Sequence, residues 1–333
     1  MEGLGRDPAV NAVPRDPLGI REGARFVVDA SQQVSIDQDA LAAYCRGLAQ
    51  ESQAPKPEWE SEFHFAGELE ATIAYVFCLD TVNFCFWGDP KWHRPYRRQW
   101  LDGYWALAAA LTEEVAANPQ FVAADNLCQL DSQGLQRVLD GTPTIPLLEE
   151  RAANLRELGR WVGQRYGGRF SAIVRAAGSD AIALVRLVVD GLSSYRDEAV
   201  YKGRLVPFYK RAQILAADLQ GALSGHGWPA LARVEDLTAF ADYKLPQLLR
   251  HQGILRYTGS LAELVDGQVP IEAGSEEEVE IRANTVWAVE LMGQELEALG
   301  MPRPAYQIDW MLWYASQDSG HMKPYHRTRT IYY

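Results

Sequence analysis

The stretch that most constrains the fold is residues 68–87, ELEATIAYVFCLDTVNFCFW. After its first turn, apolar side chains occupy most positions and leave no continuous polar face for water. A helix that is apolar on all sides has to be buried by its neighbours. The stretch therefore predicts a long helix inside the core.

Most of the remaining chain also shows helical periodicity, so we expect a mostly α fold with minor, short β elements. Residues 24–36 and 62–68 alternate in polarity over short spans and predict edge strands or a small sheet. Residues 201–209 predict a hairpin around Gly203. Further helices are expected at 35–51, 103–117, 145–168, 179–190, 208–223, 235–241, 246–252, 276–299 and 306–315.

The length of 333 residues allows one large domain or two intimately packed subdomains. No segment resembles a flexible linker, so we expect a single helical domain over residues 25–333. Residues 1–24 are rich in proline, glycine and charge, and they predict an irregular N-terminal arm.

The formal net charge of −12 opposes non-specific binding to a polyanion. Such binding depends on the neutralisation of many phosphates, so we expect no direct nucleic-acid partner. A single small phosphate can still bind where local donors gather. No apolar run approaches the length needed to span a bilayer, so no membrane partner is expected.

Four cysteines occur without a CxxC pair, and Cys78 and Cys85 lie in apolar surroundings. They predict buried free thiols in a reducing, cytoplasmic location. The chain also lacks GxxxxGK[ST], a GxGxxG after a strand, GxSxG and HExxH. We therefore expect neither a metal site nor nucleotide-triphosphate chemistry.

Residues 80–92, DTVNFCFWGDPKW, gather four aromatic rings at the end of the predicted core helix. A helical face with a carboxylate, an amide and two rings can bind the edge and the face of a flat heterocycle. The alternative is core packing, with the polar groups satisfied by the backbone. If the helix runs through position 87, the side chains on this face are Asp80, Asn83, Phe84 and Trp87.

Two further carboxylates are candidates for function. Asp242 is predicted to lie between two short helical pieces, because Pro246 disfavours helix at the residue before it. A carboxylate there either caps a helix or acts in catalysis. Asp309 lies in an apolar helical stretch, where a carboxylate is costly unless it is paired. Its partner can be a buried arginine or a cationic ligand.

Positive charge concentrates within residues 195–215 of this otherwise acidic chain. The cluster can bind one phosphate, or it can form a solvated face paired with nearby acidic residues. The aromatic C-terminal stretch 323–333 predicts a tail docked on the body. The residues of the basic cluster are Lys202, Arg204, Lys210 and Arg211, with Tyr201 and Tyr209 beside them.

Considered together, these stretches resemble the queuosine salvage protein family, the queuosine 5′-phosphate N-glycosylase/hydrolases. The resemblance extends from about residue 60 to residue 333 in one order, which is far more specific than a single motif. The matching runs are DTVNFCFWGDPKW, GYWALAAAL, IPLLEERAANLRELG, SYRDEA, FYKRAQILAADL, LTAFADYKLPQLLRHQGIL, IDWMLWYASQ and HRTRTIYY.

The resemblance implies a helical body similar to the helix-hairpin-helix DNA glycosylases. It also implies cleavage of the N-glycosidic bond of queuosine 5′-monophosphate, which releases queuine for reuse in tRNA, without a metal or an organic cofactor. Asp242 matches the family's catalytic position. Imine-type lyase chemistry is not implied, because the lysine-rich junction of the glycosylase lyases is not reproduced.

The chemistry of this substrate suggests the remaining roles. Glycosidic cleavage passes through an oxocarbenium-like state, and a 7-deazaguanine has carbon where purines accept an assisting proton. An ionised Asp242 near the anomeric carbon is therefore expected to stabilise the sugar cation and to position water, with direct covalent attack on that carbon as the alternative. Queuine also carries a cationic secondary amine, for which Asp309 is the first expected partner and Asp80 the second. Other expected contacts are Asn83, Phe84 and Trp87 with the base, Tyr209 and Lys210 with the phosphate, helped by Arg211 or Lys202, and Tyr243, Lys244 and Trp313 around the site.

Two rival functions are open, and the first cleaves the same class of bond. One is a base-excision glycosylase acting on nucleic acid, which the net charge of −12 opposes. The other is a non-catalytic helical protein that binds a nucleobase. Turnover of queuosine 5′-monophosphate separates both from a nucleotide hydrolase.

Overall fold

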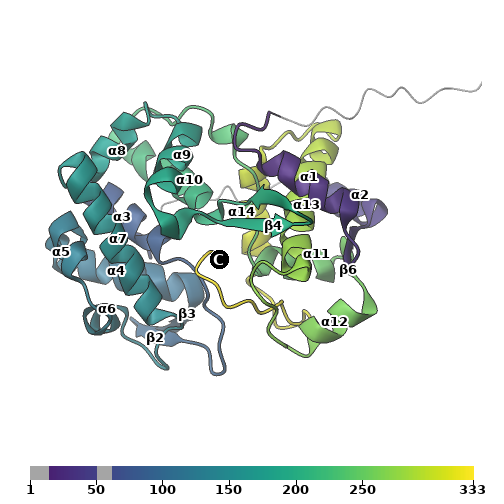
Figure 1. The fold of residues 1–333 in the computed structure, drawn as a ribbon, viewed down its shortest axis with the longest axis horizontal. Helices are drawn as coiled ribbons and strands as arrows, with labels where there is room; N and C mark the ends of the chain where they lie inside the picture. Colours follow the sequence, from purple (N-terminus) through teal and green to yellow (C-terminus); the bar gives the residue numbers. More distant parts are fainter. Residues whose placement is uncertain (1–14, 51–61) are drawn as a thin grey trace, which may run out of the picture.

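The structure, a computed structural model, describes residues 15–50 and 62–333. The prediction of a mostly α fold is confirmed for this part of the chain. Two groups of helices lie side by side, each around one long buried helix, α3 or α13 (Figure 1). The first group contains α3 (Leu69–Thr81), α4 (Gly103–Ala117), α5 (Ala124–Gln129), α6 (Ser132–Leu139), α7 (Leu148–Tyr166), α8 (Phe170–Ala176), α9 (Ala181–Gly191) and α10 (Lys210–Leu223). The second contains α1 (Ile20–Ala30), α2 (Gln38–Gln50), α11 (Lys244–His251), α12 (Gly259–Asp266), α13 (Glu276–Ala298) and α14 (Ala305–Ala315).

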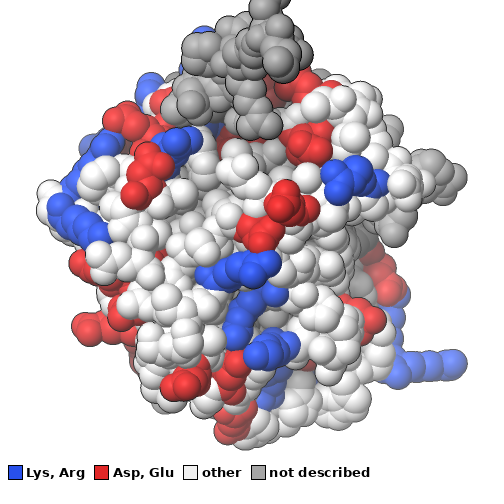
Figure 2. Space-filling model, turned by 90° about the vertical axis from the view of Figure 1, so that its right-hand side faces the viewer, with Lys and Arg blue, Asp and Glu red and all other residues white. Residues whose placement is uncertain are grey.

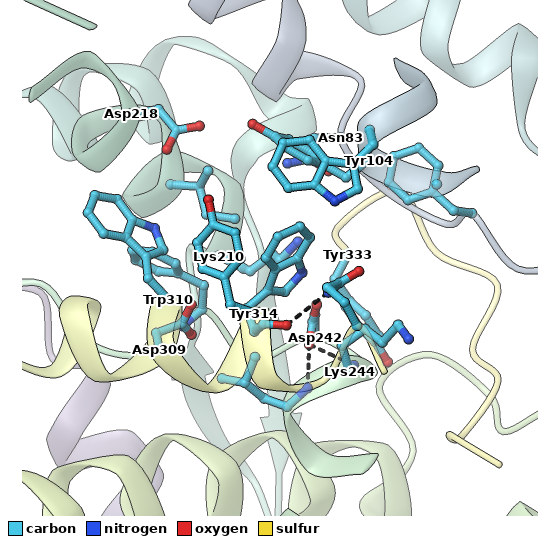
Figure 3. Close-up of a pocket in the computed structure, with 18 of the residues that line it drawn as sticks. Asn83, Tyr104, Lys210, Asp218, Asp242, Lys244, Asp309, Trp310, Tyr314 and Tyr333 are labelled. Carbon is cyan, nitrogen blue, oxygen red and sulfur yellow. Dashed lines mark hydrogen bonds between the residues drawn. The ribbon is translucent and has the colours of Figure 1, made fainter. Parts of the chain in front are cut away.

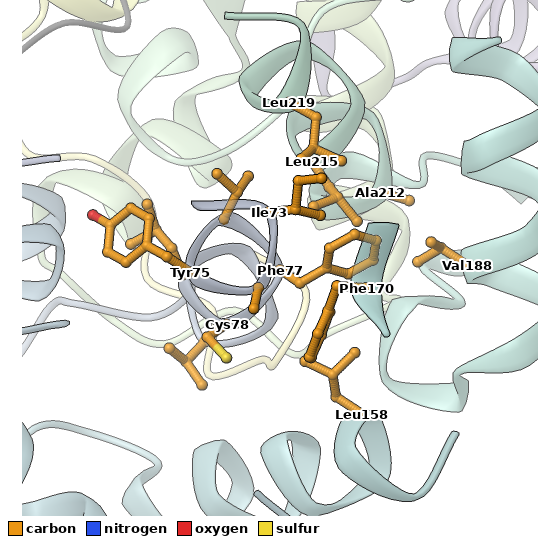
Figure 4. Packing of buried hydrophobic residues seen from close by; sticks show 14 of the residues in the cluster. Ile73, Tyr75, Phe77, Cys78, Leu158, Phe170, Val188, Ala212, Leu215 and Leu219 are labelled. Carbon is orange, nitrogen blue, oxygen red and sulfur yellow. The ribbon is translucent and has the colours of Figure 1, made fainter. Parts of the chain in front are cut away.

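Helix α3 forms the centre of the first core, as its composition predicts. Every residue from Thr72 to Thr81 is buried. Figure 4 shows Phe77 of this helix facing Phe170 of α8, and the two ring centroids are 5.4 Å apart. Neighbours on several sides thus cover a helix that has no polar face.

Helix α3 nevertheless ends at Thr81, earlier than the expected position 87. Two fully or almost fully buried arginines take the carbonyl groups that further helical turns would have used. The predicted shared face of Asp80, Asn83, Phe84 and Trp87 is therefore wrong, because the last three follow the helix in extended or irregular conformation. Arg211 donates to the carbonyls of Asp80, Thr81 and Ser194, and Arg151 donates to those of Val82, Phe84, Cys85 and Pro146.

The strand expected over residues 24–36 is mostly helix. Ile20, Ala24 and Val27 recur at helical spacing and bury one face of α1, so the period of 3.6 prevails over the local alternation. Only Val34–Ile36 is extended, as β1. Residues 1–14 of the expected arm lie outside the described residues, and its last residues, 20–24, belong to α1.

The helix expected over residues 235–241 is also wrong. A single 3₁₀ turn, Val234–Asp236, is followed by extended backbone. Distant side chains bind this backbone in place of helical hydrogen bonds. Gln213 accepts from the Thr238 N–H at 2.8 Å, and Asp309 accepts from the Phe240 N–H at 2.7 Å.

Three small antiparallel sheets of two strands each complete the described part of the fold. The hairpin predicted at 201–209 is confirmed, and its turn places Lys202 and Gly203 at φ of 46° and 80°, as such tight turns require. The strand predicted at 62–68 is wrong, since this segment forms turns and coil. The sheets are β1 with β6 (Leu255–Tyr257), β2 (His93–Tyr96) with β3 (Gln99–Asp102), and β4 (Glu198–Tyr201) with β5 (Arg204–Pro207).

The C-terminal stretch docks on the body, as predicted. Tyr333 is 2% exposed, and its carbonyl accepts a 2.8 Å hydrogen bond from the N–H of Cys85. Arg327 forms an ion pair with Asp89 at 2.5 Å. Cys78 and Cys85 are buried and free, which confirms the prediction for these thiols.

The surface of one face carries a short row of basic side chains with acidic side chains beside it (Figure 2). This face therefore offers no extended basic surface, in keeping with the net charge of −12. Among the described helices, none has both the length and the apolar character that crossing a bilayer requires.

We expect Arg151→Met to lower the free energy of unfolding by roughly 3–5 kcal/mol, because it leaves several buried carbonyls without a donor. Urea unfolding followed by circular dichroism measures this difference. Arg160→Met, an exposed position on the same helix, is the matched control and should change stability by no more than about 0.5 kcal/mol. Equal stability of the two variants would contradict the role given to Arg151.

Candidate active site

A cavity of about 300 Å³ lies where the two groups of helices meet. Helices α4 and α10 of the first group and α14 of the second supply much of its wall. Tyr333 and residues from the segments 83–86 and 240–245 also line it. Charged side chains and aromatic rings face the same space (Figure 3). This size and lining are typical of a site for a small molecule.

The structure separates the sequence-based site candidates into two sets. Eight of the eleven line this cavity, and three lie outside it. The eight are Asn83, Phe84, Lys210, Asp242, Tyr243, Lys244, Asp309 and Trp313, and the three are Asp80, Trp87 and Tyr209.

Each of the three outside the cavity has a different environment. Asp80 is fully buried on α3. The indole N–H of Trp87 donates to the carbonyl of Thr328 at 3.3 Å. The hydroxyl of Tyr209 donates to Glu198 at 2.6 Å. Trp87 and Tyr209 are therefore engaged in contacts away from the pocket.

The basic cluster at 195–215 does not converge on one point. Lys202 donates to the carbonyl of residue 30 at 2.6 Å, and Arg204 pairs with α1. Arg211 is occupied by backbone carbonyls inside the core. Only Lys210 of these four basic residues lines the cavity.

The segment after α3 reaches the cavity because its backbone and one ring are held from both sides. The guanidinium of Arg151 lies 4.3 Å from the centroid of the Phe84 ring, and that of Arg211 lies 5.0 Å from it. These cation–π contacts and the hydrogen bonds to the backbone fix Phe84 in the cavity wall. Asn83 is held next to it.

Asp242 both caps a helix and faces the cavity. Its Oδ1 accepts hydrogen bonds from the N–H groups of Lys244 and Leu245 at 2.8 and 2.9 Å, at the start of α11. The capping interpretation of this residue is therefore confirmed, and its catalytic role stays a prediction. Within the described residues no donor occupies Oδ2, so this second oxygen is available to a bound molecule.

Lys210 lies close to two carboxylates of the cavity. It is 6% exposed, and burial lowers the pKa of its ammonium group, while Asp242 and Asp309 oppose that shift. Burial raises the pKa of Asp309 well above its usual range, although its Oδ1 accepts from the Phe240 N–H. One buried lysine therefore lies close to both carboxylates at this end of the cavity.

Aromatic rings form another wall of the cavity. Trp313 of α14 meets Tyr104 and Trp105 of α4 in edge-to-face contacts, with ring centroids 5.6 and 5.5 Å apart. Tyr314 lies 5.4 Å from Trp313 in the same arrangement. The hydroxyl of Tyr104 is hydrogen-bonded to His64 at 2.8 Å. These rings offer flat surfaces on which a heterocycle can stack.

Several lining residues were missed by the sequence patterns, although α14 carries a signal for them. Its pocket residues recur at the spacing of one helical face. Asp218 on α10 is a lone acid in an apolar stretch, the same signal that identifies Asp309. The missed residues include His64, Tyr104, Trp105, Asp218, Tyr306, Trp310, Tyr314 and Tyr333.

The described residues contain no group of three or more histidine, cysteine or acidic side chains arranged to hold a metal ion. The groups that line the cavity include carboxylates, lysines and aromatic rings.

Comparison with known proteins gives consistent matches. A sequence profile described as queuosine salvage protein matches residues 63–333. A protein of Sphaerobacter thermophilus named queuosine 5′-phosphate N-glycosylase/hydrolase is 45% identical over 97% of this chain and 100% of its own length. Proteins with the same name from Mus musculus and Dictyostelium discoideum are 36% and 34% identical, over 95% and 94% of this chain and 99% and 98% of theirs.

We expect Asp242→Ala to be less stable than Asp242→Asn by about 1 kcal/mol. Both substitutions remove the charge, but asparagine keeps an oxygen that can accept from the N–H groups of Lys244 and Leu245. Urea unfolding of the two variants isolates the capping contribution from the loss of charge. Identical midpoints and slopes would show that the cap does not stabilise α11.

Proposed function

Because this chain belongs to the queuosine salvage protein family, we propose that it hydrolyses the N-glycosidic bond of queuosine 5′-phosphate and releases queuine for salvage into tRNA. The observation that carries the proposal is the placement of Asp242. One carboxylate oxygen is fixed by two backbone N–H groups, and the side chain lines a cavity walled by aromatic rings.

Asp242 is proposed to act at the anomeric carbon. The sugar becomes cationic as the glycosidic bond breaks, and an ionised carboxylate stabilises that charge and orients water. Protonation at position 7 cannot assist departure, since a 7-deazaguanine has carbon there. Stabilisation of the sugar cation therefore carries more of the rate acceleration than it does for a purine.

Lys210 and Asp309 are proposed to support Asp242. The ammonium of Lys210 is attracted to both carboxylates, and this attraction opposes the lowering of its own pKa by burial. The sequence-based hypothesis placed Lys210 at the phosphate and Asp309 at the cationic amine. Their closeness to Asp242 instead favours roles at the sugar.

The 5′-phosphate is proposed to bind near Lys244 and Lys91. Both lysines line the cavity, and burial followed by the charge of Lys91 lowers the pKa of Lys244. Lys91 also pairs with Asp102 at 3.1 Å, and a phosphate with several oxygens can accept hydrogen bonds from both lysines. Lys244 also donates to the hydroxyl of Ser319 at 3.2 Å, which orients its side chain.

We also propose that the helical body is related to the helix-hairpin-helix glycosylases and acts as a single domain. The predominance of helices in the described residues and a carboxylate at the start of α11 support this relationship. Four free cysteines support the reducing, cytoplasmic location expected from the sequence.

Purified protein incubated with queuosine 5′-phosphate should release queuine, detected by mass spectrometry. Asp242→Asn should reduce kcat by at least about 100-fold, because the charge that stabilises the sugar cation is lost. Asp39→Asn, an exposed position on α2, is the matched control and should retain the full rate. No release by the wild type would overturn the proposed function, and full activity of Asp242→Asn would overturn the role of Asp242.

Lys244→Met should raise the KM for queuosine 5′-phosphate by about tenfold and change that for the unphosphorylated nucleoside far less, since only the former offers an anion. Lys202→Met, at an exposed lysine outside the cavity, serves as the control. Steady-state kinetics with both substrates measures the ratio of the KM for the nucleoside to the KM for queuosine 5′-phosphate. A ratio equal to that of the wild type would place the phosphate elsewhere.

A further inference from the structure

A second pair of carboxylates lies apart from the Asp242 end of the cavity. Asp218 lines the cavity from α10, and Asp80 lies behind it on α3, which packs directly against α10. Asp218 is 7% exposed and Asp80 is fully buried. In Figure 3, Asp218 and Asn83 approach the cavity from the side opposite Asp242 and Lys244.

Neither carboxylate of this pair has a satisfying partner among the residues that the structure describes. Both oxygens of Asp80 lack a donor at hydrogen-bonding geometry, although the Asn83 amide is close enough to lower its pKa in part. Asp218 differs from Asp80 in that its side chain lines the cavity, where a bound molecule can reach it. Buried carboxylates without donors are costly, so the pair requires a proton or a ligand.

The pair is within reach of the base of a nucleotide whose sugar lies at Asp242. The charge of Lys210 acts on Asp242, on Asp80 and on Asp218, so one side chain lies close to both ends of this part of the cavity. In a 7-deazaguanine with an aminomethyl substituent on carbon 7, the ammonium nitrogen is one methylene group beyond the ring that carries the glycosidic bond. Trp310 and Tyr314 line the same cavity and provide apolar surface along it.

We infer that Asp218, supported by Asp80, receives the secondary ammonium group of the substrate's base. The identity of the substrate rests on the proposed function, whereas the acidic subsite rests on the structure. The neutral N–H edge of the base would need only one carboxylate. Binding of that edge at Asp218 would therefore leave the fully buried Asp80 without a role. A full positive charge offsets the repulsion between the two carboxylates.

The pair holds a proton when the cavity contains no cation. Burial, followed by the charge of Asp80, raises the pKa of Asp218 well above its usual range, and burial also raises that of Asp80. Two adjacent buried carboxylates do not both ionise without a compensating charge. When the ammonium binds, the shared proton leaves to solvent and both carboxylates become ionised.

Other groups around the pair do not replace this function. Lys210 lowers the pKa of both carboxyl groups and Arg211 lowers that of Asp80, but neither cancels the effect of burial. The phenols stay neutral through the physiological range because burial raises their pKa. The charged and titratable groups that interact electrostatically with one or both carboxylates of the pair are Lys210, Arg211, Tyr75, Tyr104, Tyr195 and Tyr314.

Isothermal titration calorimetry with queuine and with 7-deazaguanine tests this inference without requiring turnover. The wild type should bind queuine at least about tenfold more tightly, since 7-deazaguanine lacks the ammonium group. Repeating the queuine titration in buffers of different ionisation enthalpy should show proton release on binding. Equal affinity for the two bases, or no proton release, would overturn the inference.

Two variants complete the test. Asp218→Asn should lose the preference for queuine and the proton release while keeping its affinity for 7-deazaguanine within about twofold. Asp80→Asn should keep the preference and release fewer protons, because Asp218 then ionises more readily in the empty cavity. An unchanged preference in Asp218→Asn would overturn the assignment. If the wild type discriminates between the bases but does not hydrolyse queuosine 5′-phosphate, the subsite stands and the proposed function fails.

Discussion

The position of the cavity depends on two buried guanidinium groups, those of Arg151 and Arg211. Together they bind successive carbonyl groups where α3 ends, and they lie near the Phe84 ring. A planar group with several N–H donors suits this task, because it can satisfy carbonyls that point in different directions. Without these donors the apolar sequence after Thr81 would favour a longer helix. The segment that carries Asn83 and Phe84 would then be directed away from α10 and α14.

Charge inside the cavity is arranged at a cost to stability. A buried lysine lies between the carboxylates of Asp242 and Asp309, and a second acidic pair lies further along α10. Replacing such groups by apolar residues of similar size is often neutral or stabilising in folded proteins. Their retention within a cavity that also contains exposed ring faces is better explained by binding and chemistry than by folding.

Elements can be predicted from the sequence where the residues that fix their ends are close by in the chain. Residues 276–298 begin after Ser275, whose hydroxyl accepts from the Glu278 N–H, and the helix follows as expected. By contrast, residues 237–241 stay extended because side chains far away in sequence, such as Gln213, bind their backbone. No local pattern contains that information. For the same reason Asp242, Asp309 and Lys210 could be selected as unusual charges, while the ring partners that α4 contributes could not.

The cavity wall joins segments from much of the described chain, from His64 before α3 to Tyr333 in the docked tail. Contacts of such large sequence separation form late, because long loops have to close before the contacts can stabilise them. During synthesis on the ribosome, the first group of helices can emerge and collapse well before α14 and the tail are available. The nascent polypeptide therefore has an incomplete cavity, and the binding surface comes into being only when the last segments have packed.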